Sequence, residues 1–241
     1  MCIAKKCQED LKDFLSYELA PYPMSLFNED GMRKGTKSAL YSAFTPLPID
    51  FELPTNHMVV ADGGHLLHKV VWNRNVTFER ICADYVKYIH QHYGHSVMVV
   101  FDGYPEDTGQ STKSAERARR FKVNASADVI FDKTTVNSTP QEHLSKEQNK
   151  KRFVKLLQTA LEASNITTKQ AVEDADVLIV STAKSLASQY EAVVIVGEDV
   201  DLLILLAGTS PATDNVYIRK PGRSNSPVLF YSFTSLKYFP F

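Results

Sequence analysis

Short apolar runs alternate with longer, partly polar stretches along the chain from residue 58 onward. The apolar runs Met58 to Ala61, Val97 to Phe101 and Val193 to Val196 each predict a buried strand. The stretch from Phe78 to Tyr93 predicts a helix between the first two of these strands. Strands that alternate with helices in this way are typical of βαβ units, so we expect an α/β fold with a mostly parallel sheet.

A further helix is predicted between about residues 140 and 164, where one apolar stripe runs at helical spacing. The stripe consists of Phe153, Leu156, Leu157, Ala160 and Leu161. Thr139-Pro140-Gln141-Glu142 has the pattern of a capping box with Pro at the first helical position. The helix is therefore expected to begin near residue 140.

The remaining patterns outline both ends of the chain. A helix should run from near Glu173 through Ser188, and two final strands, Val216 to Ile218 and Val228 to Tyr231, should flank a Pro/Gly turn. Near the N-terminus a short amphipathic pattern precedes a segment rich in Pro, Gly and Lys, which predicts a docking helix and an irregular wrap. We therefore divide the chain into an N-terminal extension, residues 1–57, and a core, residues 58–241.

Composition sets limits on this picture. A chain of 241 residues that is 44% hydrophobic can bury one substantial core, and its net charge of -1 gives no overall attraction to nucleic acid. Three cysteines without a CxxC pair indicate a reducing, intracellular setting, although nucleus and cytoplasm are not distinguished. The longest apolar stretches are interrupted by acidic residues, so neither a membrane span nor a membrane partner is expected.

Four acidic clusters follow predicted strands or begin predicted helices. They are Asp62 with Gly63 and Gly64, Asp102 with Gly103, Glu173-Asp174-Ala175-Asp176, and Glu198-Asp199-Val200-Asp201. In an open parallel sheet, ligands bind at the carboxyl ends of the strands. Carboxylates gathered there would raise one another's pKa unless a cation neutralised them, so the clusters predict metal ions with hard oxygen ligands.

Each cluster also has a purely structural explanation. Asp62 suits a helix N-cap, and Asp174 with Asp176 suits an ordinary first turn, where the helix dipole favours negative charge. Asp199 and Asp201 lie between two long apolar runs, so we expect them to be shielded from solvent and bound to metal.

The order of the clusters adds to what each one indicates. VVADGG, VVFDG, EDADVLIV and VIVGEDVDLL, taken in sequence, resemble the PIN-like nuclease superfamily and, within it, the flap endonuclease and 5′-nuclease branch. The resemblance covers residues 58 to about 206 and implies a Rossmann-like three-layer α/β/α fold. It also implies two divalent ions, Mg²⁺ or Mn²⁺. In that family the metal ligands also carry the catalysis. The residues of this chain that match them are Asp62, Asp102, Asp174, Asp176, Asp199 and Asp201. Glu173 is the alternative to Asp174 as the match for one of these ligand positions.

Two basic segments are candidates for contact with DNA or RNA. The first, which matches an arch in flap endonucleases, contains Lys113, Arg117, Arg119 and Arg120. The second lies on the helix predicted near residues 140–164 and contains Lys146, Lys150, Lys151, Arg152 and Lys155, for which an ordinary exposed face is the favoured interpretation. The chain departs from the family in its long N-terminal extension, and we expect it to lack the family's helical DNA-binding region after the last motif.

Three functions fit these observations. The resemblance implies a metal-dependent nuclease that hydrolyses phosphodiester bonds by a two-metal mechanism. The first alternative is a catalytically degenerate PIN-like module that binds nucleic acid or a protein partner. The second takes Asp199-Val200-Asp201 as the DxD motif of a haloacid-dehalogenase-type phosphatase, although that motif should open the fold. The sequence leaves open the choice between DNA and RNA, the mode of cleavage and the oligomeric state.

Overall fold

The computed structural model describes residues 27–28, 31–32, 37–104, 128–137, 144, 146–209, 215–222 and 227–235. The chain divides into two units, Met1–Leu40 and Tyr41–Phe241. In the first unit, β1 (Phe27–Asn28) pairs antiparallel with β2 (Gly31–Met32). The 3-10 helix η2 (Lys37–Ala43) leads into the second unit. The domain boundary after residue 57 stays a prediction, and the second unit begins earlier, at Tyr41.

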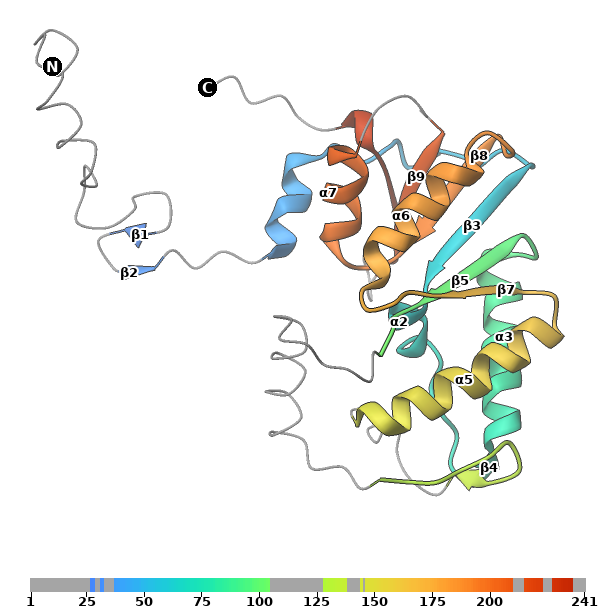
Figure 1. Ribbon diagram of the computed structural model, residues 1–241. Helices are drawn as coiled ribbons and strands as arrows, with labels where there is room; N and C mark the ends of the chain where they lie inside the picture. The colour runs from blue at the N-terminus through green and yellow to red at the C-terminus, as the bar shows by residue number, and fades with distance from the viewer. Residues whose placement is uncertain are drawn as a thin grey trace, which may run out of the picture. The chain divides into compact units, whose positions relative to one another are not determined.

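A six-stranded sheet forms the centre of the second unit (Figure 1). In spatial order its strands are β10 (Leu229–Ser232), β9 (Val216–Lys220), β8 (Ala192–Val196), β3 (His57–Asp62), β5 (Val97–Phe101) and β7 (Thr167–Gln170). Strands β3, β5, β7, β8 and β9 run parallel to one another, and β10 runs antiparallel to β9. Every residue of β5 and β8 is buried, because helices cover both faces of the sheet.

Helices lie on both faces of the sheet. They are α2 (Gly63–Leu67), α3 (Phe78–Tyr93), α5 (Glu147–Ala163), α6 (Ala175–Leu186) and α7 (Val200–Gly208). The first three pack with Val59 and Val99 in one apolar cluster, whereas α6 and α7 pack with Val60 and Val100 in another. Figure 1 shows the two helix pairs α3/α5 and α6/α7 on either side of the strands. The predicted three-layer α/β/α fold with a mostly parallel sheet is therefore confirmed.

Hydrogen bonds hold the short helix α2 against α3. The Tyr85 hydroxyl donates to the carbonyl oxygen of Leu67 at 2.8 Å and accepts from Trp72 Nε1 at 3.0 Å. Tyr85 is fully buried, and burial raises the pKa of its hydroxyl. Because α2 directly follows Asp62, this anchor also fixes the end of β3.

The structure agrees with most of the predicted elements. The helix Phe78–Tyr93 and the strand Val97–Phe101 have the predicted bounds. By contrast, α5 begins at Glu147, because Lys146 has extended backbone angles. The predicted capping box at residues 139–142 lies outside the described residues, as does the N-terminal amphipathic pattern.

Three short strands of the second unit escaped prediction, as did β1 and β2 in the segment expected to be an irregular wrap. β7 is polar and partly exposed at the edge of the sheet, and so lacks the apolar pattern of a buried strand. The other two, β4 (Val76–Thr77) and β6 (Val136–Asn137), form a two-stranded antiparallel pair of their own. Among the described helices, none is long and apolar enough to cross a membrane.

Candidate metal centre

The carboxyl ends of three neighbouring parallel strands bring the acidic clusters to one edge of the sheet. Asp62 ends β3, Asp102 follows β5, and Gly197 with Glu198 follows β8. Because β3 lies between β5 and β8, all three segments emerge side by side. The remaining cluster begins α6, which packs against these same strands.

Asp62 is both a helix cap and a partly buried carboxylate. Its Oδ1 accepts a hydrogen bond of 2.8 Å from the backbone N–H of Gly64, at the start of α2. Burial, with a smaller contribution from the charge of Asp102, raises the pKa of Asp62 to about 6. The pKa of Asp62 is lowered by hydrogen bonds from the backbone N–H groups of His65 and Gly64 and by the charge of Lys150.

Asp102 lies close to Asp62, across Gly64. A Cβ atom placed on Gly64 would be 3.2 Å from Asp62 Oδ1 and 3.9 Å from Asp102 Oδ2. The other oxygen of Asp102, Oδ1, accepts a hydrogen bond of 3.2 Å from the backbone N–H of Ala175, the first residue of α6. Asp102 therefore joins the end of β5 to the start of α6 while its second oxygen faces the Asp62 side.

A close backbone contact reinforces this junction. The N–H of Gly103 donates to the carbonyl oxygen of Glu173 at 2.9 Å. A Cβ atom at Gly103 would lie 2.0 Å from the carbonyl oxygen of Val172, so a side chain has no room there. Glycine at this position thus allows the segment before α6 to pack directly on the end of β5.

Three carboxylates form an acidic triad beside this junction. Asp176, Asp199 and Asp201 each offer a ligand oxygen, and these oxygens all lie within 4.8 Å of one another. Asp174 caps α6 by accepting from Asp176 N at 3.3 Å, and Asp199 caps α7 by accepting from Asp201 N at 3.1 Å. Two helix N-termini therefore meet at the triad, where their dipoles offset part of the carboxylate repulsion.

The acidic triad borders the carboxylates of Asp62 and Asp102. Asp102 is bonded to Ala175, which immediately precedes Asp176. On the other side, Asp62 Oδ2 lies 3.8 Å from a Cβ atom built on Gly197, two residues before Asp199. Five of the predicted carboxylates are thus gathered along one edge of the sheet.

The prediction that Asp199 and Asp201 are shielded from solvent is wrong. Asp199 is exposed and Asp201 is half-buried. The apolar residues after them belong to α7, whose helical spacing turns Leu202, Leu203 and Leu206 into the core. The side chains of Asp199 and Asp201 are consequently left nearer the surface.

Asp174 and Glu173 occupy different places at the start of α6. Asp174 is exposed and uses a carboxylate oxygen to cap the helix, whereas Glu173 is half-buried and lies one residue before the cap. Among the described residues, the acidic triad includes Asp176 but neither of these two. Their assignment as metal ligands stays a prediction.

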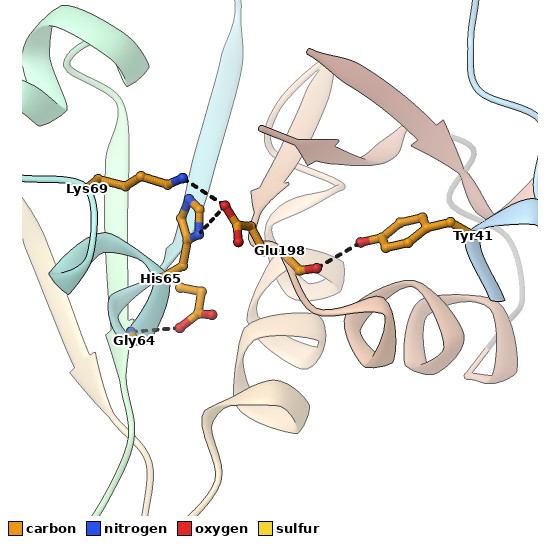
Figure 2. A network of polar contacts seen from close by, with 6 residues as sticks. Tyr41, Gly64, His65, Lys69 and Glu198 are labelled. Carbon is orange, nitrogen blue, oxygen red and sulfur yellow. Dashed lines mark hydrogen bonds and ion pairs between the residues drawn. The ribbon is translucent and has the colours of Figure 1, made fainter. Parts of the chain in front are cut away.

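Glu198 turns away from the triad and forms an ion pair that the sequence did not predict. Its Oε1 accepts from Lys69 Nζ at 2.8 Å and lies 3.8 Å from His65 Nδ1 (Figure 2). The Tyr41 hydroxyl donates to the Glu198 carbonyl oxygen at 3.4 Å. Lys69 and Glu198 are 129 positions apart, so no local pattern could have paired them. The ion pair ties the end of α2 to the turn between β8 and α7.

Basic side chains also reach this edge of the sheet. Lys150, half-buried on α5, is close enough to lower the pKa of Asp62. The amino groups of Lys150 and Lys151 lie 5.8 Å and 6.0 Å from the centre of the Tyr104 ring, just beyond Asp102. Lys150 is thus placed beside the acidic residues, where an open solvated face was expected. The other basic segment, with Lys113, Arg117, Arg119 and Arg120, lies outside the described residues.

The chemistry of this edge suits a hard divalent cation. Carboxylate oxygens, which several segments of the chain supply here, are the ligands that Mg²⁺, Mn²⁺ and Ca²⁺ prefer. The raised pKa of Asp62 reflects the cost of ionising a buried carboxylate beside another one. A bound cation would remove that cost, so the donor set fits a metal.

Neither a protein-family model nor a curated protein matches the sequence. Several solved structures do match. A complex of the bacteriophage T5 flap endonuclease with DNA and metal ions is 18% identical, covering 68% of this chain and 55% of that one, with a TM-score of 0.41. The catalytic core of Rad2 with a DNA substrate is 14% identical, covering 83% and 55%, with a TM-score of 0.46. The T5 5′-exonuclease with bound zinc is 19% identical, covering 68% and 55%, with a TM-score of 0.40.

The chain spans about half the length of the solved structures that it matches. They include a flap endonuclease and a 5′-exonuclease of bacteriophage T5. At such identities and TM-scores the likeness concerns the fold and says nothing of the activity of this chain.

Proposed function

We propose that this protein is a metal-dependent nuclease that hydrolyses phosphodiester bonds of DNA or RNA. The observation that carries the proposal is the acidic triad, whose three ligand oxygens lie within 4.8 Å of one another next to Asp62 and Asp102. The order of the four acidic motifs along the chain, which resembles that of 5′-nucleases, supports it.

The carboxylates would divide into two ligand groups. The acidic triad would hold one divalent ion, Mg²⁺ or Mn²⁺, and Asp62 with Asp102 would contribute to a second. Such ions, when bound, activate water and offset negative charge on the phosphate. No side-chain nucleophile is required, which agrees with the carboxylate-rich composition of the site.

The surrounding residues would orient the ligands and the phosphate. The caps made by Asp62 and Asp199 fix the side-chain rotamers of both residues. The Lys69–Glu198 ion pair holds the turn that carries Asp199 and Asp201. Lys150 supplies a positive charge beside Asp62 and would attract a phosphate group. Lys113, Arg117, Arg119 and Arg120 are also proposed to contact the nucleic acid.

The experiment is a cleavage assay with the purified full chain and Mg²⁺ or Mn²⁺ on labelled flap DNA, single-stranded DNA and single-stranded RNA. Asp199→Asn and Asp102→Asn keep the hydrogen-bonding shape of the side chain but remove its charge. We expect each variant to lose about 100-fold or more in rate, because a metal ligand is weakened. Asp50→Asn, at an exposed position in a turn, is the matched control and should retain full activity.

Activity that survives in both Asp199→Asn and Asp102→Asn would rule out the proposed site. A second function is favoured by one specific observation: Asp62, Asp174 and Asp199 each cap a helix, so they serve stability without any metal. A protein that binds nucleic acid or a protein partner but cleaves none of the substrates would support this non-catalytic role. Turnover of a generic phosphomonoester would instead support a phosphatase.

A further inference from the structure

A pocket of about 290 Å³ opens next to the Lys69–Glu198 ion pair, at the carboxyl ends of β8 and β9. Its walls include Lys69 after α2, Val196 at the end of β8 and Arg219 in β9, and the last turns of α3 add Tyr88, His92 and Tyr93. We call it the Tyr88 pocket. Its volume is near the lower limit of about 300 Å³ for small-molecule sites, which suits one ring system with a substituent.

The charge of the Tyr88 pocket favours an anion. Two cationic side chains, Lys69 and Arg219, line it, and none of the described lining residues is acidic. The Arg219 guanidinium is held in place, because its Nη1 donates to the carbonyl oxygen of His92 at 2.9 Å and its Cζ lies over the Tyr93 ring, 5.5 Å from the ring centre. Arg219 retains further N–H donors, since a guanidinium carries five. A planar guanidinium fixed in this way is suited to a phosphate.

Aromatic rings form another part of the lining. Tyr88 and His92 lie with ring centres 4.3 Å apart, and Tyr88 and Tyr93 meet edge to face with centres 5.8 Å apart. Tyr88 is half-buried and His92 is exposed, so both can be reached by a ligand, whereas Tyr93 is buried behind them. Accessible aromatic rings stack on flat aromatic groups and do not distinguish one such group from another.

We propose that the Tyr88 pocket binds one nucleotide, with the nucleobase against Tyr88 and His92 and the phosphate at Arg219 and Lys69. The proposal rests on the proposed nuclease function, because it makes the pocket a subsite for the nucleic-acid strand beside the metal centre. Lys69 connects the Tyr88 pocket with the candidate metal centre, because it lines the pocket and its amino group contacts Glu198, the residue before Asp199. The pocket recognises an aromatic ring and a phosphate together, so the ligand class is a nucleoside monophosphate unit.

The test is a calorimetric titration of the full chain with thymidine 5′-monophosphate in the presence of EDTA, so that the metal centre takes no part. We expect saturable binding, with inorganic phosphate alone and thymidine alone each at least about tenfold weaker, because each lacks one of the two contacts. Arg219→Gln and Tyr88→Leu should each weaken binding of the monophosphate by about tenfold.

Matched controls lie elsewhere on the same unit. Arg80→Gln alters an exposed arginine at the other end of α3, and Tyr190→Leu alters a half-buried tyrosine outside the pocket. Both should bind the monophosphate as the unchanged protein does. Thermal melting of all four variants identifies any that fails to fold, and either pocket variant alone suffices for the test.

The two proposals fail in different ways. Absence of saturable binding, or equal binding by the pocket variants and the controls, would overturn the Tyr88 pocket as a nucleotide site even if the protein cleaves nucleic acid. Asp199→Asn should bind the monophosphate normally in EDTA while losing cleavage. If the unchanged protein binds the monophosphate in the pocket yet never cleaves, the nuclease proposal fails and the binding site stands.

Discussion

Gly103 lies where the end of β5 meets the segment that leads into α6. A Cβ atom there would lie 2.0 Å from the carbonyl oxygen of Val172 and 2.1 Å from that of Ala171. Both atoms belong to backbone, so relief requires the chain itself to move. The close approach places Asp102 within hydrogen-bonding distance of Ala175 and so shapes the metal centre.

We predict that Gly103→Ala lowers the free energy of unfolding by about 2 kcal/mol or more, as overpacking against fixed backbone does. Chemical denaturation measures the change. Gly208→Ala is the control, because a Cβ atom at Gly208 meets nothing within 4 Å and alanine is the better helix residue at the end of α7. That variant should be neutral or slightly stabilised. Equal stability of the two variants would contradict the packing assigned to Gly103.

Asp62 gives the metal-free protein a characteristic dependence on pH. Burial raises its pKa from 3.8 to about 6 in the folded state. Between these two values the unfolded chain is ionised while the folded protein keeps its proton, so stability should fall as the pH rises from about 4 to about 6. The loss should be on the order of 2 kcal/mol and complete above the folded pKa.

Urea denaturation across this pH range, in EDTA, compares the unchanged protein with Asp62→Asn. Asparagine still caps α2 but has no proton to lose. The variant should therefore lack the decline between pH 4 and 6. Parallel curves for the two proteins would show that Asp62 ionises as readily in the folded state as in the unfolded chain.

At the scale of elements, α5 holds the segment that precedes β6. Asn149 is fully buried, and its Oδ1 accepts from the backbone N–H of Val129 at 2.9 Å. One turn later, Arg152 Nη1 donates to the carbonyl oxygen of Val129 at 2.9 Å and pairs with Asp128. Two residues after Val129, Phe131 stacks on Phe78 of α3 with ring centres 4.1 Å apart.

We predict that Asn149→Ala lowers the free energy of unfolding by about 1–3 kcal/mol, because it leaves the partly buried Val129 N–H without this acceptor. Gln148→Ala, at an exposed neighbouring position of the same helix, should change stability by less than about 0.5 kcal/mol. Thermal unfolding of both variants makes the comparison. A loss no larger in Asn149→Ala than in Gln148→Ala would contradict the role given to Asn149.

At the scale of the whole molecule, the candidate metal centre is assembled only by the folded chain. Its carboxylates come from the ends of β3 and β5 and from the first turns of α6 and α7. The two that lie furthest apart in the chain, Asp62 and Asp201, are separated by 139 positions (201 minus 62). An unfolded chain would not hold these groups together. Metal binding should therefore stabilise the fold.

We predict that Mn²⁺ at about 100 times its dissociation constant raises the free energy of unfolding by about 2.7 kcal/mol. Differential scanning fluorimetry should show a matching rise in melting temperature. Asp201→Asn should abolish most of the rise, because it removes the charge of one member of the acidic triad, whereas Asp50→Asn should keep it. A shift of equal size in both variants would assign the metal to another place.

The apolar runs of β3, β5 and β8 were sufficient to predict the sheet, because a strand covered on both faces needs an uninterrupted apolar sequence. The same runs located Asp62 and Asp102, which directly follow an apolar segment, and Asp199, which comes three residues after Val196. β7 was missed because an edge strand can be polar. The start of α5 was placed too early, because the pattern that indicated its cap lies several residues before Glu147.

The sequence by itself determined the α/β class, the main strands and helices, and the acidic residues at their ends, because these follow from local periodicity and chain order. Only the tertiary structure decided how those residues are used. It grouped Asp176, Asp199 and Asp201, turned Glu198 toward Lys69, and left Asp199 exposed. It also brought Lys69, Tyr88 and Arg219 to one pocket. Such groupings depend on contacts between residues far apart in the chain, and no local pattern encodes them.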